Sequence, residues 1–388
     1  MSLTKIVEQL VRGTAEIISV ENLKDKIKES QSTGQPLRIK AGFDPTAPDI
    51  HLGHVVLLRK LRQFQDLGHE VFFLIGDFTA QIGDPSGRYQ LRPKMSLETV
   101  AENAKTYQAQ VFKILNKKRT KVVFNSTWLA KMNIQQLLEL TALSSVAQML
   151  ARADFKKRFE DGKEISLLEF IYPLLQGYDS VYLKSDVELG GADQKFNLLM
   201  GRQLQESFRQ TPQVVVMTPL LEGLDGVKKM SKSFGNYIGI NEPPAEILGK
   251  IMSMSDQTMY RYYEILTDCN LSEINNLHPK EAKLKLGEHI VSQFYNEDLA
   301  KQSRQQFEKI FSQGDVPDDI INFNLRKDGS DQIMDVLLTT KLVASKNEVR
   351  RLLKQGAITH EGQKIADENW QVQKGILKIG KRRFLRLS

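Results

Sequence analysis

The chain has 388 residues, 41% of them hydrophobic and 26% charged, and a net charge of +7, so it is long enough for two or three domains with buried cores. Its single cysteine, Cys269, excludes an intrachain disulfide and a cysteine-rich zinc site and is typical of a reducing compartment. No apolar run approaches the roughly 20 residues that span a bilayer, and no signal-peptide block stands at the start, so we expect a cytoplasmic protein without a membrane partner.

The first predicted unit is a strand, loop, helix and strand. Residues 37–43 alternate apolar and polar side chains, as a half-buried strand does. From His54 onward apolar residues recur at helical spacing, and Gly68 stands where a helix C-terminus prefers glycine. A strand over residues 71–75 follows. This βαβ unit predicts a doubly wound parallel sheet, in which ligands bind at the carboxyl ends of the strands.

The remaining pattern predicts the other half of the sheet and two further domains. Strands are expected at residues 181–187 and 214–217, with a helix over residues 193–205 between them. We therefore expect a Rossmann-like catalytic domain at 1–225 with a helical insertion at about 88–180, an α-helical domain at 226–325 that begins with a lysine-bearing loop, and a small α+β domain at 326–388.

Two histidines flank a glycine at the first strand-to-helix junction, in the string His51-Leu52-Gly53-His54. Free N–H groups and the helix dipole favour an anion there, and Gly53 lets a ligand approach the backbone. Imidazoles on the same turn can donate hydrogen bonds to phosphate oxygens. Helix capping, or a pair without function, explains the string equally well. A metal site is not expected, because neither carboxylate nor cysteine stands at ligand spacing.

A second motif, Lys229-Met230-Ser231-Lys232-Ser233, lies in a loop that runs from Gly226 to Gly235; we call residues 226–235 the lysine loop. Its ammonium groups can follow the charge that builds on a leaving pyrophosphate. A basic loop without function is the alternative for these five residues alone. The two motifs in this order, on a split sheet, resemble the two class-defining motifs of class I aminoacyl-tRNA synthetases.

The surrounding sequence resembles the tyrosyl-tRNA synthetases, most closely the bacterial branch with a C-terminal S4-type RNA-binding domain. The segments that carry this resemblance are Gly42-Phe43-Asp44-Pro45-Thr46, Ile82-Gly83-Asp84-Pro85-Ser86-Gly87, Tyr172-Pro173-Leu174-Leu175-Gln176-Gly177-Tyr178-Asp179 and Leu189-Gly190-Gly191-Ala192-Asp193-Gln194. The resemblance implies a tyrosine–tRNA ligase that converts L-tyrosine and ATP to tyrosyl-adenylate and pyrophosphate and then transfers tyrosine to the 3′ end of tRNA(Tyr).

The resemblance also implies a role for each matching residue. Asp179 would accept a hydrogen bond from the substrate phenol, Asp84, Tyr172 and Gln176 would hold its ammonium group, and Gln194 would place it. Asp44, Thr46, His51, Gly53 and His54 would lie along the ATP phosphates, Gly191 and Asp193 at the ribose, and Lys229 and Lys232 over the phosphates. ATP would enter with Mg²⁺ as a substrate complex, and no tightly bound cofactor is expected.

The residue types suit this chemistry. A buried carboxylate that faces a phenol rejects phenylalanine, because its charge is then left desolvated and unpaired. Standing alone, Asp84 would be read as a turn residue, Tyr172 as core and Asp179 as a helix cap. Lys40 departs from the family pattern, which has a second tyrosine beside the substrate phenol in many members, so selection of tyrosine is expected to depend more heavily on Asp179.

The C-terminal segment has a basic surface. Residues 326–388 contain 14 Lys and Arg against 7 Asp and Glu, which accounts for the whole surplus of positive charge. Residues 345–358 resemble the helical core of S4 domains, with Val349 and Leu352 on its apolar side. A solvated basic tail or a protein-interaction module is the alternative. The residues expected to contact RNA are Lys346, Arg350, Arg351, Lys354, Lys381, Arg382 and Arg383.

Three other functions remain open from sequence. A tryptophanyl-tRNA synthetase would share the architecture, although Tyr172, Gln176 and Asp179 argue against it. A catalytically silent RNA-binding protein would have no need of His51 and Lys232. A small nucleotidyltransferase would lack the lysine loop and the basic tail. The family implies a homodimer formed through the insertion, with tRNA, tyrosine and ATP as partners and no DNA.

Overall fold

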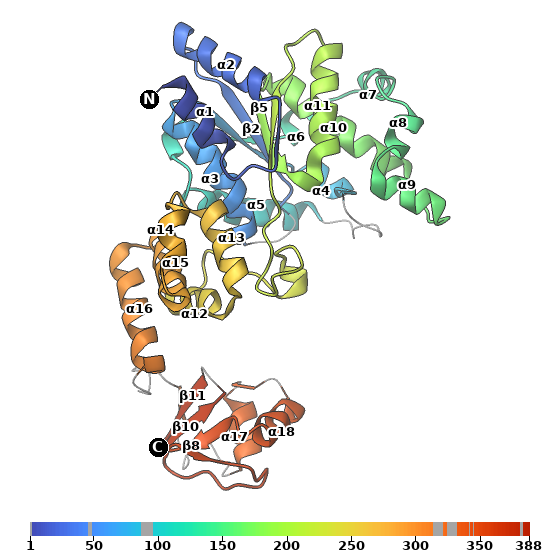
Figure 1. The fold of residues 1–388 in the computed structure, drawn as a ribbon. Coiled ribbons are helices and arrows are strands. Elements are labelled where there is room, and N and C mark those ends of the chain that lie inside the picture. Colours follow the sequence, from blue (N-terminus) through green and yellow to red (C-terminus); the bar gives the residue numbers. More distant parts are fainter. Residues whose placement is uncertain are drawn as a thin grey trace. The chain divides into compact units, whose positions relative to one another are not determined.

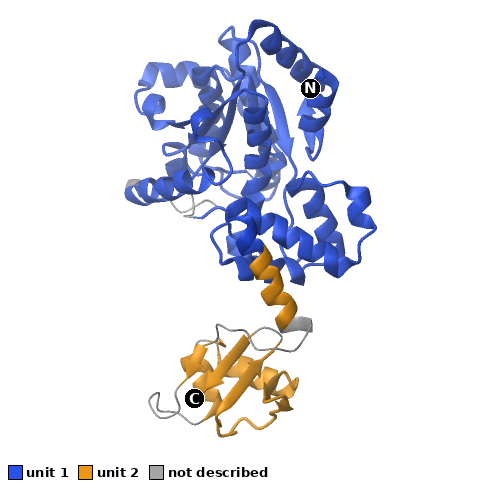
Figure 2. Cartoon of the chain, turned by 90° about the vertical axis from the view of Figure 1, so that its left-hand side faces the viewer, with its two compact units in different colours: residues 1–300 blue, residues 301–388 orange. Residues whose placement is uncertain are grey.

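The computed structural model describes residues 2–45, 49–86, 96–312, 321–323, 332–340, 342–343, 345–380 and 383–388. Contacts divide the chain into two compact units, Met1–Ala300 (unit 1) and Lys301–Ser388 (unit 2), shown in blue and orange in Figure 2. Within the described part of the chain, every helix is too short or too polar to span a bilayer.

A six-stranded sheet lies at the centre of unit 1 (Figure 1), in the order β1-β6-β5-β2-β3-β4. All neighbouring strands are parallel except the edge strand β1, which is antiparallel to β6. The mixed α/β architecture with a parallel sheet confirms the predicted fold class. The strands are β1 (Glu16–Ile18), β2 (Arg38–Phe43), β3 (Glu70–Ile75), β4 (Thr120–Phe124), β5 (Val187–Gly191) and β6 (Val214–Thr218).

Both faces of the sheet are buried, and β3 shows why. Val71 and Phe73 point to one face, where they share a core with helix α3, whereas Phe72 and Leu74 point to the other and pack with residues of α10 and α11. A strand that is buried on both faces reads as a continuous apolar run, and the run of β3 is of this kind. Helices on both faces are therefore required to cover the sheet, as a doubly wound fold provides.

The helices of unit 1 fall into three groups along the chain. Those before β4 are α1 (Leu3–Val11), α2 (Val20–Thr33), α3 (Leu52–Asp66), α4 (Thr79–Ile82) and α5 (Leu97–Val111). Between β4 and β6 lie α6 (Ser126–Leu129), α7 (Ile134–Thr141), α8 (Val146–Leu150), α9 (Ala153–Glu160), α10 (Leu167–Leu183) and α11 (Lys195–Ser207). After the sheet come α12 (Pro244–Ser253), α13 (Asp256–Leu266), α14 (Leu271–Asn275) and α15 (Pro279–Phe294).

Two elements correct the sequence prediction. The described part of the region 88–180 is mostly helical, but it contains β4, which pairs with β3 in the central sheet, so the run of helices between the sheet's halves begins only after β4. The strand expected at residues 181–187 is wrong, because α10 continues to Leu183 and β5 begins at Val187. Val181 and Leu183 are apolar since they pack into a helical core, not because they belong to a strand.

Helix α16 (Glu297–Ser312) crosses the division between the two units. Unit 2 holds a five-stranded sheet in the order β7-β11-β10-β8-β9 and the helices α17 (Ile333–Thr339) and α18 (Lys346–Lys354). Its strands are β7 (Ile321–Phe323), β8 (Ile358–His360), β9 (Gln363–Lys364), β10 (Gly375–Ile379) and β11 (Arg383–Leu387). This is the small α+β unit that the sequence predicts, and its likeness to S4 domains stays a prediction.

Candidate active site

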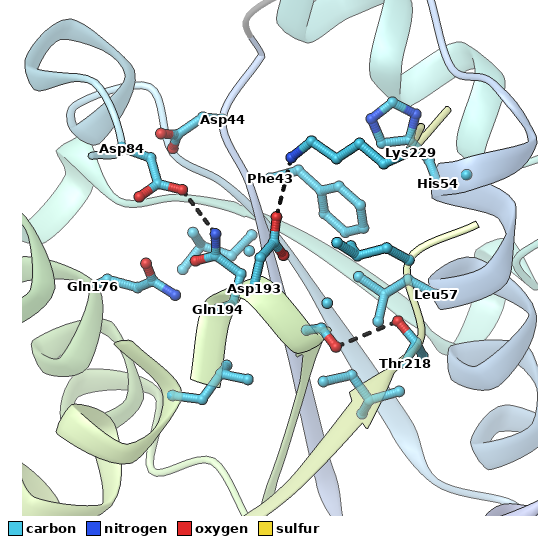
Figure 3. A pocket seen from close by; sticks show the side chains of 18 of the residues that line it. Phe43, Asp44, His54, Leu57, Asp84, Gln176, Asp193, Gln194, Thr218 and Lys229 are labelled. Carbon is cyan, nitrogen blue, oxygen red and sulfur yellow. Dashed lines mark hydrogen bonds and ion pairs between the residues drawn. The ribbon is translucent and has the colours of Figure 1, made fainter. Parts of the chain in front are cut away.

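A pocket of about 670 Å³ opens beside the carboxyl ends of β2 and β5 and the N-terminus of α3, where a doubly wound sheet binds its ligands. The structure brings almost all the predicted substrate residues together around it, and Figure 3 shows several of them. Those that line it are Asp44, His51, Gly53, His54, Asp84, Tyr172, Gln176, Asp179, Gly191, Asp193, Gln194, Lys229 and Lys232. Thr46 lies outside the described residues.

The two histidines cap helix α3 reciprocally. His51 is the N-cap, and its Nδ1 accepts the backbone N–H of Gly53 at 3.2 Å. The backbone N–H of His51 in turn donates to His54 Nδ1 at 3.2 Å, an arrangement equivalent to a capping box. A Cβ on Gly53 would lie 2.9 Å from the His51 ring, so a larger residue here would displace the imidazole. The capping alternative is confirmed, and it fixes both rings at the wall of the pocket.

Capping and burial also decide the protonation of these rings. Burial, with the charges of His54 and Lys232, lowers the pKa of His51 from 6.5 to about 2. Burial and Lys232 lower the pKa of His54 to about 4. Both imidazoles are therefore neutral at pH 7, and since each Nδ1 accepts a backbone hydrogen, each Nε2 carries the proton. The pair can offer two N–H donors to an anion without adding a positive charge.

The lysine loop faces the pocket from the other side. Lys229 Nζ lies 3.3 Å from Asp193 Oδ2, the ion pair drawn in Figure 3, and Lys232 Nζ lies 2.6 Å from Asp49 Oδ2. The side chain of Asn236 holds the loop, because it accepts the backbone N–H of Ser231 at 2.9 Å. Both ammonium groups are thus paired with carboxylates, and a bound polyphosphate would compete with those partners.

Helix α10 presents three of the predicted residues on one face. Tyr172, Gln176 and Asp179 are spaced four and three residues apart, which places them on the same side of a helix. Asp179 lies inside the helix and not at its end, so the helix-cap alternative for Asp179 is wrong. Tyr172 is buried, but its Oη donates to Asp44 Oδ2 at 2.8 Å at the pocket, so it is more than a core residue.

The carboxylate of Asp179 is almost fully enclosed, with 1% of the residue exposed. Trp128 Nε1 donates to Oδ1 at 2.8 Å and Asn125 Nδ2 to Oδ2 at 3.3 Å. Burial raises the pKa of Asp179 from 3.8 to about 7, against the opposing effects of the Lys40 charge and these two hydrogen bonds. The group is therefore poised between its two protonation states near neutral pH.

A chain of side-chain amides joins the other predicted residues. Gln194 Nε2 donates to Asp84 Oδ2 at 2.8 Å, as Figure 3 shows. Asp84 Oδ1 also accepts the backbone N–H of Ser86, which confirms the turn role considered for Asp84. The buried Asn197 of α11 donates to both Gln194 Oε1 and Gln176 Oε1 at 3.0 Å. Asn197 thereby orients the side-chain amides of Gln176 and Gln194, which lie on different elements of the chain.

Sequence reasoning missed three residues of this neighbourhood, namely Trp128, Asn125 and Asn197. No sequence pattern predicts these three residues, because only the folded chain brings them into contact with Asp179 and Gln176. Among the described residues, no cluster of histidine, cysteine and carboxylate side chains is arranged to hold a metal ion.

Residues 31–312 match the family model described as tRNA synthetases class I (W and Y), and the chain belongs to this family. Full-length relatives narrow the membership to the tyrosine–tRNA ligases, and the tryptophan alternative is not favoured. The tyrosine–tRNA ligase of Desulfotalea psychrophila is 50% identical over 100% of this chain and 98% of its own, and that of Aquifex aeolicus is 53% identical over 97% and 96%. That of Geobacter sulfurreducens is 50% identical over the whole of both chains.

Solved structures share the fold. A C-terminally truncated mitochondrial tyrosyl-tRNA synthetase from Aspergillus nidulans has a TM-score of 0.66 at 23% identity, over 80% of this chain and 94% of its own. The enzyme from Archaeoglobus fulgidus in complex with L-tyrosine has a TM-score of 0.63 at 22% identity, over 78% and 100%. At these identities the likeness concerns the fold alone.

Proposed function

We propose that this pocket binds tyrosine and ATP together and that the named residues act in the roles expected from sequence. The observation that carries the proposal is the enclosed carboxylate of Asp179, which lies at the pocket on the same helix face as Gln176. A phenol hydroxyl can donate to it, whereas phenylalanine would leave it unpaired. Gln176, Tyr172 and Asp84 then offer the substrate ammonium group its polar partners.

Activation needs no side-chain nucleophile. A carboxylate oxygen of tyrosine attacks the α-phosphorus of ATP, the bond from that phosphorus to the bridging oxygen breaks, and pyrophosphate leaves. Positive charge and hydrogen-bond donors must meet the charge that develops on the phosphates. Neutral His51 and His54 supply N–H donors from one wall, and Lys229 and Lys232 supply ammonium groups from the lysine loop. Mg²⁺ would enter with ATP as part of the substrate and would neutralise part of its charge.

In the second step a terminal hydroxyl of tRNA attacks the acyl carbon and AMP leaves.

Tyrosine affinity should fall with decreasing pH as Asp179 becomes protonated. A carboxylate accepts a phenol hydrogen more strongly than a neutral acid does, and the pKa of Asp179 is about 7. Binding should therefore be about tenfold weaker at pH 6 than at pH 8, if the carboxylate form alone binds well. Calorimetric titration with tyrosine, without ATP, measures this.

His51 and His54 cannot cause a change of tyrosine affinity between pH 6 and pH 8, because their pKa values of about 2 and 4 lie below that range. The control is Asp179→Asn, whose weaker binding should not change between pH 6 and pH 8. A wild-type affinity that is independent of pH would contradict the role given to Asp179.

We assign tRNA contacts to α18 in unit 2. Val349, Leu352 and Leu353 of this helix are buried, as expected, and the basic residues of its other face are exposed. Arg350 of this helix pairs with Glu368 at 2.8 Å, and Arg383 of β11 pairs with Glu348 at 3.0 Å, so these two arginines are held within unit 2. Lys346, Arg351 and Lys354 have no ion-pair partner among the described residues. Lys381 and Arg382 lie outside the described residues.

Replacing Lys346, Arg351 and Lys354 together by alanine should weaken tRNA binding and leave tyrosine activation unchanged. Each lost phosphate contact makes the negative slope of log K against log salt less steep by about 0.7–0.9, so the three together should change it by about 2–3. Filter binding of tRNA at several salt concentrations measures it. The matched control replaces three exposed lysines of unit 1, Lys5, Lys24 and Lys28, and should keep the wild-type slope. Equal slopes for both triple variants would exclude α18 as the contact.

A homodimer formed through the helices after β4 also belongs to the proposal. Ile134 is 78% exposed, Leu138 lies one turn further on the same face of α7, and Leu167 at the start of α10 is 77% exposed. Apolar side chains left in water at these positions favour a second copy as their cover.

Replacing Ile134 and Leu138 by lysine should halve the mass found by sedimentation at micromolar concentration. Val20→Lys is the control, because Val20 is an exposed apolar residue outside this region. A wild-type chain that sediments as a monomer would contradict the dimer. We also propose the domain boundaries at 225 and 325. A cytoplasmic location is proposed as well, because tRNA is charged where tRNA is found.

A further inference from the structure

Lys40 of β2 lies at the wall of the pocket, yet its side chain is fully buried, with 0% exposed. The three hydrogens of its ammonium group have three acceptors: Glu188 Oε1 at 2.8 Å, Ser180 Oγ at 2.8 Å and the backbone oxygen of Gln176 at 3.1 Å. An ammonium has no further donor. Lys40 therefore cannot replace a phenol-binding tyrosine as a direct hydrogen-bond donor to the substrate.

Glu188 is held as completely as Lys40. It lies on β5 directly across from Lys40 in the sheet register. Its second oxygen accepts hydrogen bonds from Ser180 Oγ at 2.9 Å and from Gln213 Nε2. We call Lys40, Glu188, Ser180 and Gln213 the buried quartet.

The fold keeps space for the buried quartet. A Cβ on Gly201 of α11 would lie 2.6 Å from Gln213 Nε2 and 3.2 Å from Glu188 Oε2. A larger residue at this position would therefore have to displace the Gln213 amide from the buried quartet.

The contacts of Lys40 fall on the turn of α10 that selects the substrate. Its ammonium binds the carbonyl of Gln176 and the hydroxyl of Ser180, which is the neighbour of Asp179. Two hydrogen bonds from the Lys40 ammonium therefore hold the backbone at Gln176 and the side chain next to Asp179. The positive charge of Lys40 also favours the ionised form of Asp179, and Glu188 opposes it to a smaller extent.

Stability alone does not explain a charged pair at this depth. Removing two charges from water costs about as much as their attraction returns, and well-packed apolar residues often replace such a pair without loss. Breaking the pair at one end is far more damaging, because it leaves one charge buried and unpaired.

We propose that Lys40 is a positioning residue for tyrosine selection, held by Glu188, which fixes the Gln176–Asp179 turn of α10 and supplies positive charge behind the carboxylate. This inference rests on the proposed role of Asp179. It predicts that tyrosine recognition depends on Lys40 even when the fold does not.

The test compares Lys40→Met with the double variant Lys40→Met/Glu188→Gln in ATP–pyrophosphate exchange at pH 8. Lys40→Met leaves Glu188 charged and unpaired and should unfold at lower temperature. The double variant has no charge left in the buried quartet and should regain most of that thermal stability. Its KM for tyrosine should nevertheless rise about tenfold, the size of a lost charge-assisted interaction. Its KM for ATP should stay within about twofold, and its preference for tyrosine over phenylalanine should fall.

A double variant with wild-type tyrosine KM and wild-type preference would overturn the proposal and leave Lys40 a structural residue. Ser180→Ala, which removes one acceptor and no charge, serves if the double variant does not fold. Its tyrosine KM should rise by about threefold with the ATP KM unchanged, and no rise would equally overturn the proposal.

Asp179→Asn in the same assay separates this inference from the proposed function. If Asp179→Asn loses tyrosine activity while the double variant does not, only the role of Lys40 fails. If Asp179→Asn behaves as wild type, the assignment of the tyrosine pocket itself fails.

Discussion

Replacing Lys232 by alanine should lower kcat for tyrosine activation by about 10²–10³-fold, the usual effect of deleting one donor aimed at developing charge. The affinity for ATP should change by less than about tenfold, because the interaction strengthens only as negative charge builds on the leaving pyrophosphate. Single-turnover formation of tyrosyl-adenylate, measured over a range of ATP concentrations, separates the two quantities.

Two control variants define the result for Lys232. Lys228 is an exposed lysine of the same loop whose ammonium lies over the ring of Phe234 and not at the pocket, so Lys228→Ala should keep the wild-type rate. Asp49→Asn removes the carboxylate that pairs with Lys232 and should weaken neither ATP binding nor the rate. A loss of ATP affinity with an unchanged kcat in Lys232→Ala would mean that the lysine contributes only to ground-state binding.

Replacing Asp179 by asparagine should lower kcat/KM for tyrosine by about 10²-fold at pH 8, since a charge-assisted hydrogen bond in a buried site is lost. Activity with phenylalanine should rise, because the uncharged amide no longer resists being left without a phenol partner. Pyrophosphate exchange with each amino acid gives the ratio of the two kcat/KM values.

A second buried carboxylate on α10 serves as the control for Asp179. Glu169 pairs with Arg158 at 2.5 Å and does not line the pocket. Glu169→Gln should destabilise the chain but keep its preference for tyrosine over phenylalanine. If both variants lose that preference alike, the effect belongs to the helix as a whole and not to the carboxylate at the pocket.

Local sequence pattern predicted the part of the fold that builds the pocket. The alternation in β2 and the helical spacing in α3 are strong signals, and both elements form where expected. The end of α10 cannot be predicted from sequence, because Lys184 ends that helix with a left-handed backbone, φ 48°. Glycine usually marks such a position, so a lysine there does not indicate a helix end, and the apolar Val181 resembles a strand residue.

Sequence motifs predict the residues of the candidate site but not the side chains that bind to them. The histidine pair, the lysines and the α10 face all line one pocket. Trp128 and Asn125 stand 51 and 54 residues before Asp179 in the chain, so only the folded sheet brings them to its carboxylate. In the same way Lys40 reads as an exposed strand residue, and its burial follows from Glu188 on the neighbouring strand.

The measurement that tests the account most directly is ATP–pyrophosphate exchange by the purified chain with each of the twenty amino acids in turn, without tRNA. We expect exchange with tyrosine alone, because amino-acid activation does not require tRNA and Asp179 selects the phenol. Exchange with tryptophan instead would contradict the reading of Asp179, and no exchange with any amino acid would contradict the catalytic role of the pocket.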